Sequence, residues 1–153
     1  MKLSLLRWLL VAGLLAALVG EAGRGRHRLG ASVLLNRCEM VSLQARQAGA
    51  AGKGVLQSVL NVLRAAGEAN PVEVGVPIAT GSVHLLLGSP QAAIGYYQQA
   101  LELEKRPETY LNLGRAQQAM GDLAAAKESY ALALKLDPLL APQVPDALRP
   151  AAP

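Results

Sequence analysis

Phenylalanine is absent from this sequence of 153 residues, and aromatic side chains make up only 3% of it. Nucleic-acid surfaces usually interleave aromatic with basic side chains, and no aromatic interleaves with the basic cluster Arg24, Arg26 and Arg28. Basic residues beside an apolar run are typical of a segment that flanks a membrane. We therefore interpret the arginines in this way and expect no nucleic-acid partner.

Cysteine and histidine are equally scarce. Cys38 is the only cysteine, which excludes an intrachain disulfide, and His27 and His84 are the only histidines. No Cys, His and Asp residues have metal-ligand spacing, so we expect no metal. Counting alone leaves a Cys–His pair open, but nothing around Cys38 suggests a nucleophile, and we predict that Cys38 is buried and structural and that His84 packs inside a helix. With no convergent catalytic set, we expect no enzyme activity and no cofactor.

Uncharged apolar residues are concentrated at the amino terminus, from Trp8 to Gly20, behind Lys2 and Arg7. This run has the length of a signal-peptide core, and counting from Leu3 makes it long enough to approach a full span if Arg7 reaches the interface. The best small-residue cleavage site, which ends at Ala22, contains the charged Glu21, and this disfavours cleavage.

We therefore predict that residues 1–22 are a retained membrane anchor or uncleaved signal segment, with residues 3–20 in contact with lipid. Residues 23–30 would form a basic juxtamembrane linker. The expected localisation is a single-pass membrane protein. Basic residues flank both ends of the run, so the side of the membrane stays open. Cleavage would instead give a secreted or periplasmic binding module.

The second half of the chain repeats itself at a shift of 33 residues. Ala and Leu, which are strong helix formers, dominate both copies, and a regular match at this period is typical of stacked helix pairs. Gly81 and Gly114 are predicted to lie inside the first helix of each copy, where a neighbouring helix comes close. The matched positions are Gly81 with Gly114, Gly88 with Gly121, Ala93 with Ala126, Tyr97 with Tyr130 and Ala100 with Ala133, and Pro138 closes the second copy.

Turn chemistry supports the same division into helices. Gly88 and Gly121 are predicted to end the first helix of each copy in the left-handed conformation that glycine adopts at little cost. The residues that follow them, Ser89 and Asp122, are of the types that cap a helix amino terminus, and we predict that they cap the second helices. The alignment therefore predicts both the helices and the turns between them.

The second copy, with YLNLG, Ala116, GD, Ala126, Tyr130 and LDP, resembles the tetratricopeptide repeat family. The resemblance implies an all-α, right-handed α-solenoid of antiparallel helix pairs, here preceded by a hydrophobic amino-terminal helix. We assign repeats to residues 72–105 and 106–138. Residues 31–71 are assigned to a degenerate repeat, so that the repeats span 31–138. In that first copy Gly54, Val59, Leu63 and Ala66 align with Gly88, Ala93, Tyr97 and Ala100.

The resemblance also implies a concave groove, lined by the first helices, that binds a peptide or helix of another protein. Asn112 and Arg115 lie three residues apart on one helix face and could together hold a backbone amide or a carboxylate. Chaperone-binding members of the family clamp a carboxylate in this way, but Ile78 and Ser82 do not supply the other members of that clamp. The expected groove residues are Ile78, Ser82, Leu85, Asn112, Arg115 and Gln118, with Leu111 and Ala119 beside them.

The sequence thus predicts a membrane-tethered scaffold for protein–protein interaction. A small structural or assembly subunit of a larger membrane complex is the alternative. Residues 139–153 form a Pro-rich tail that cannot continue the helix. Repeat arrays need a cover over their last apolar face, here the face with Leu132, Lys135 and Leu136. The tail could fold back over it, but we favour cover by a second copy or another protein docking on the last helix.

Overall fold

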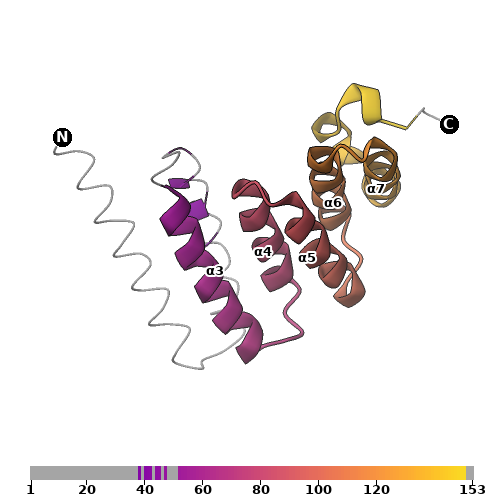
Figure 1. Cartoon of the computed structure of the whole chain (residues 1–153). Coiled ribbons are helices and arrows are strands. Elements are labelled where there is room, and N and C mark those ends of the chain that lie inside the picture. Colours follow the sequence, from indigo (N-terminus) through magenta and orange to yellow (C-terminus); the bar gives the residue numbers. More distant parts are fainter. Residues whose placement is uncertain (1–37, 39, 43, 46, 48–51, 151–153) are drawn as a thin grey trace. The chain divides into compact units, whose positions relative to one another are not determined.

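The structure is a computed structural model, and it describes residues 38, 40–42, 44, 45, 47 and 52–150 (Figure 1). Its regular elements are all helices, and no strand occurs in the described residues, which confirms the all-α class. The contacts divide the chain into two compact units, residues 1–79 and 80–153, and this boundary lies inside helix α4 (Gly75–Leu86). The predicted anchor and linker lie outside the described residues. Among the residues that are described, no helix has the length and apolarity needed to cross a membrane.

The first unit is built around α3 (Gly52–Ala69). Its buried side chains Val55, Val59 and Leu63 recur every four residues, so they form one apolar face. Cys38 is 1% exposed, as predicted for a structural thiol, and burial raises its pKa to about 11. Gly54 lies inside α3, which already begins at Gly52, so it does not end a helix as Gly88 does.

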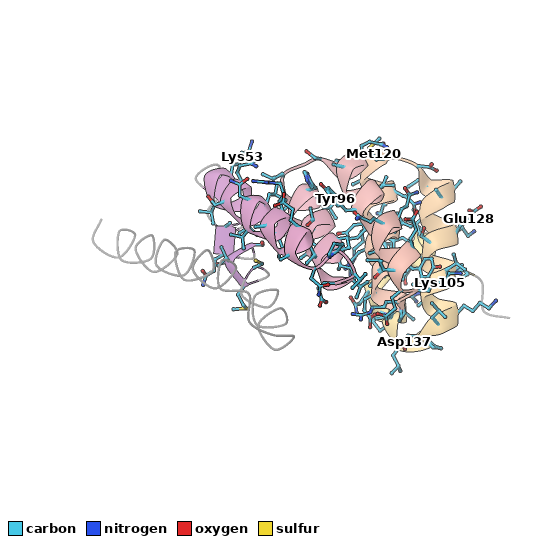
Figure 2. All side chains as sticks on the ribbon, turned by 90° about the horizontal axis from the view of Figure 1, so that it is seen from below. Lys53, Tyr96, Lys105, Met120, Glu128 and Asp137 are labelled. Carbon is cyan, nitrogen blue, oxygen red and sulfur yellow. The ribbon has the colours of Figure 1, made fainter. Side chains whose placement is uncertain are left out.

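The second unit contains α5 (Pro90–Leu103), α6 (Pro107–Met120) and α7 (Leu123–Leu136), and α6 packs against both α5 and α7. Figure 2 shows Met120 at one end of this layer and Lys105 and Asp137 at the other. The chain therefore runs up α6 and back down α7, as an antiparallel helix pair. The same pairing is expected wherever a short loop joins two amphipathic helices.

The turns follow the predicted glycines. Gly88 has φ of +74° after α4, and Gly121 has φ of +84° after α6, so both adopt the left-handed conformation. The Asp122 carboxylate accepts a hydrogen bond from the Ala125 N–H at 3.0 Å, which confirms the predicted cap of α7. Ser89 occupies the predicted N-cap position of α5, but its side chain forms no capping bond there. Pro90 occupies the first turn of α5 and has no N–H to satisfy there.

The rings of Tyr97 and Tyr130 fill the space beside Gly81 and Gly114, respectively. A Cβ atom on Gly81 would lie 2.8 Å from Tyr97 Cε1, and one on Gly114 would lie 2.7 Å from Tyr130 Cδ1 and Cε1. Both rings are almost completely buried. The close approach predicted at these glycines is therefore made by the ring of a tyrosine from the next helix, and it occurs once in each repeat.

The carboxyl-terminal tail folds back on the last repeat as two 3-10 helices, η2 (Pro138–Gln143) and η3 (Asp146–Leu148), which pack against α7. The tail therefore packs against the last helix, while cover of the face with Leu132 and Leu136 by another chain stays a prediction. Prolines are compatible with such short turns. The tail residues Leu140, Val144 and Leu148 join one buried cluster with Leu111, Ala126, Tyr130 and Ala133.

The face predicted to need cover is a different one from the face that the tail covers. Leu132 and Leu136 remain 45% and 53% exposed on α7, and Leu139, at the start of the tail, is 85% exposed. The tail instead covers the side of α7 that carries Ala126, Tyr130 and Ala133. Leu132 and Leu136, like Leu123 at the start of α7, are therefore still in contact with solvent.

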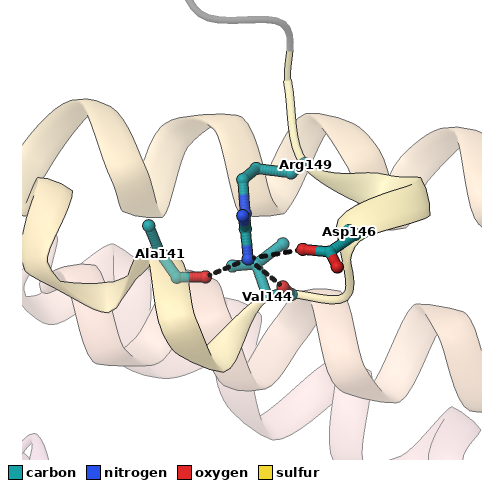
Figure 3. Close-up of polar contacts among 4 residues, drawn as sticks. All are labelled: Ala141, Val144, Asp146 and Arg149. Carbon is teal, nitrogen blue, oxygen red and sulfur yellow. Dashed lines mark hydrogen bonds and ion pairs between the residues drawn. The ribbon is translucent and has the colours of Figure 1, made fainter.

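Arg149 ties the two turns of the tail together (Figure 3). Its Nη2 donates to the backbone carbonyls of Ala141 at 2.9 Å and Val144 at 3.1 Å, and it pairs with the Asp146 carboxylate at 2.8 Å. One guanidinium thus adds a second donor to the Ala141 carbonyl, which already accepts from the Val144 N–H, and also binds the Val144 carbonyl. These contacts of Arg149 hold the tail in a defined conformation.

Candidate functional site

The residues predicted to line a groove lie on two helices. Ser82 and Leu85 are half-buried on α4, and Asn112, Arg115 and Gln118 lie on α6 within the same unit. Ile78 belongs to the first unit, where it is half-buried near the start of α4.

Arg115 differs from the other arginines of residues 52–150 in its partners. The other three form ion pairs: Arg64 with Glu68, Arg106 with Glu104, and Arg149 with Asp146. Arg115 pairs with no carboxylate in this part of the chain. Its Nη1 donates to Asn112 Oδ1 at 3.0 Å, and its Nη2 donates to Gln143 Oε1 at 3.0 Å. An exposed guanidinium held in place by two neutral amide groups can still accept an anion.

Two tyrosine hydroxyls belong to the same polar region. The Tyr97 hydroxyl lies 3.1 Å from the Ser82 hydroxyl, and the Tyr130 hydroxyl donates to Gln118 Oε1 at 2.8 Å. Burial raises the pKa of both phenols, and the positive charge of Arg115 opposes this rise at both. Arg115 is therefore within electrostatic reach of both hydroxyls. We name the Arg115 cluster as Ser82, Tyr97, Asn112, Arg115, Gln118, Tyr130 and Gln143.

Sequence reasoning missed three members of this cluster. Tyr97 and Tyr130 were assigned only a packing role, although the choice of tyrosine over an apolar residue could have indicated that each hydroxyl has a partner. No signal in the sequence pointed to Gln143, which lies 28 residues after Arg115. Leu111, aligned as a groove residue, is 2% exposed because it joins the cluster under the tail, while Ala119 is exposed.

A second aromatic feature lies on α4 and α5. His84 is half-buried, and its ring stacks on Tyr96 with the centroids 5.2 Å apart and the planes inclined by 11°. Burial lowers the pKa of His84, so its neutral form predominates at pH 7. No group of three His, Cys, Asp or Glu side chains in the described part of the chain is arranged to hold a metal ion.

The helix pairs are similar to those of known tetratricopeptide repeat proteins. A family model described as a tetratricopeptide repeat matches residues 107–138, which contain α6 and α7. The crystal structure of a thermophilic TPR protein from Thermus thermophilus is similar, with a TM-score of 0.70 and 32% sequence identity over 87% of this chain and 69% of that one.

A more distant likeness supports the fold alone. The first TPR domain of the human RPAP3 protein gives a TM-score of 0.54 at 20% identity, over 66% of this chain and 79% of that one. No protein with a curated description matches the sequence.

Proposed function

The chain belongs to the tetratricopeptide repeat family, and from this premise we propose that it is a scaffold that binds other proteins through the first helices of its repeats, not an enzyme. The similarity to a TPR protein over most of the chain supports this reading. The groove of the second unit would be lined by Ser82 and Leu85 from α4 and by Asn112, Arg115 and Gln118 from α6.

The absence of an ion pair at Arg115 within residues 52–150 is the observation that carries the proposal. A carboxylate from a partner would meet a guanidinium that Asn112 already orients, and a paired Arg–carboxylate contact is stronger than a neutral hydrogen bond. We therefore propose that Arg115 holds one acidic group of the partner, either an Asp or Glu side chain or a carboxyl terminus. Ile78 and Ser82 do not extend this site into the clamp that binds chaperone tails.

The experiment is an affinity capture with the tagged full chain from solubilised membranes, read by quantitative mass spectrometry. The test variant is Arg115→Glu, and the control is Lys127→Glu, which makes the same charge change at an exposed residue of α7. The proposal expects a partner that the wild type and the control enrich and that Arg115→Glu loses by tenfold or more. Equal enrichment with all three chains would contradict it.

We propose a membrane tether through residues 3–20 as part of the same function. The apolar run and its poor cleavage site support the tether. Membrane fractionation tests it: the chain should sediment with membranes and resist carbonate extraction. A soluble mature chain that begins near Gly23 would instead leave a secreted or periplasmic binding module.

A structural subunit of a membrane complex is the second candidate, because Leu132 and Leu136 expose apolar surface on α7. This candidate predicts the opposite pattern of variants. Leu132→Glu would release the chain from its complex or from a second copy, and Arg115→Glu would leave the association unchanged. Native electrophoresis in mild detergent distinguishes the two candidates.

A further inference from the structure

We propose that Gln143 of the carboxyl-terminal tail sets the affinity of the groove, by competing with the partner's carboxylate for Arg115. This inference rests on the proposed function and adds to it a residue that lies outside both repeats. The tail would then have two separate tasks. Its apolar residues cover the last helix pair, and its glutamine tunes the binding site next to it.

The geometry places Gln143 where the partner has to bind. Its Oε1 lies 3.0 Å from Arg115 Nη2, while Asn112 Oδ1 lies 3.0 Å from Nη1. A carboxylate that forms two parallel bonds to the two Nη atoms approaches the same Nη2 that donates to the Gln143 oxygen, so the two acceptors compete there. Asn112 shares a helix with Arg115 and orients it, whereas Gln143 reaches it from the tail.

The competition involves the side chain of Gln143 and leaves the rest of the tail in place. Leu140, Val144 and Leu148 are buried against the last helix pair, and Arg149 holds the backbone at the end of η2. The Gln143 side chain is exposed and lies outside the buried cluster of the tail, so it can turn into solvent. A charged acceptor forms a stronger bond to arginine than a neutral amide does, so the carboxylate displaces the glutamine and is weakened by that exchange.

The test uses the full chain labelled with 15N-arginine, in detergent, and follows the side-chain signal of Arg115 by NMR. This signal is identified by its loss in Arg115→Lys. The probe is N-acetyl-trialanine, whose only ionised group is its carboxylate, and the control probe is its carboxamide. The variants are Gln143→Ala, Gln143→Glu and the control Gln98→Ala, which changes an exposed glutamine of α5.

We expect Gln143→Ala to bind the carboxylate probe roughly 2- to 13-fold more tightly, which corresponds to removal of one exposed hydrogen bond from Arg115 to a neutral acceptor. Gln143→Glu should bind it more weakly than the wild type, because a carboxylate is then already paired with Arg115. Gln98→Ala should match the wild type, and the carboxamide should leave the Arg115 signal unmoved.

The outcomes separate the two proposals. Unchanged or weaker binding in Gln143→Ala, with a clear response of Arg115 to the carboxylate, would overturn the inference and leave the proposed function standing. No carboxylate-dependent shift of Arg115 in either the wild type or Gln143→Ala would overturn both.

Discussion

Alanine in place of Gly114 is expected to destabilise the last repeat, although alanine is the better helix former. In an exposed helix this substitution stabilises by about 1 kcal/mol. At Gly114 the new Cβ would lie 2.7 Å from two carbon atoms of the Tyr130 ring, well inside an ordinary contact of 3.4–4 Å. Tyr130 is fully buried and its hydroxyl is bonded to Gln118, so the ring cannot move away freely.

The chain contains a matched control for this experiment. Gly95 lies inside α5, is exposed, and has no atom within 4 Å of the position where a Cβ would be built. Gly95→Ala should therefore stabilise by about 1 kcal/mol, whereas overpacking at Gly114 adds a cost of roughly 1–3 kcal/mol. Urea denaturation followed by circular dichroism measures both. Equal stabilisation by the two substitutions would refute the packing of tyrosine on glycine.

Three further predictions concern burial. Ala126→Arg should cost roughly 3 kcal/mol or more and unfold the last repeat, because Ala126 is fully buried, while Ala124→Arg on the exposed side of α7 should keep full helicity. Leu148→Ala should lower the free energy of unfolding by roughly 2–3 kcal/mol, whereas Leu139→Ala should change it by less than about 0.5 kcal/mol, since only Leu148 is buried. Cys38 should resist alkylation at pH 8 until the chain is unfolded. The free energy of unfolding should fall between about pH 9 and pH 11, because the thiol ionises at lower pH in the unfolded chain than in the folded one. Cys38→Ala should remove this fall.

The repeat in the sequence was enough to predict the helix pairs and their turns. Glycines that recur at the same position have to serve a shared backbone need, and Gly88 and Gly121 do adopt positive φ. The paired tyrosines and glycines were also visible as a pattern. The contact itself, a tyrosine ring packed over the glycine, depends on the distance between the two helices. A single sequence does not give that distance.

The tail could not be predicted in the same way, since it has no second copy with which to align. Its prolines correctly excluded a long helix, but they do not forbid two turns of 3-10 helix that bury Leu140, Val144 and Leu148. Gln143 contacts Arg115 only because those turns place it there.

Site-specific photo-crosslinking can show whether the first helices of the repeats contact a partner protein. A benzophenone amino acid would replace Ala119, which is exposed at a predicted groove position of α6, and in a second chain Lys127, which is exposed on α7. We predict a crosslinked partner from position 119 that disappears when Arg115→Glu is added, and no such product from position 127. The same product from both positions, or from position 127 alone, would contradict it.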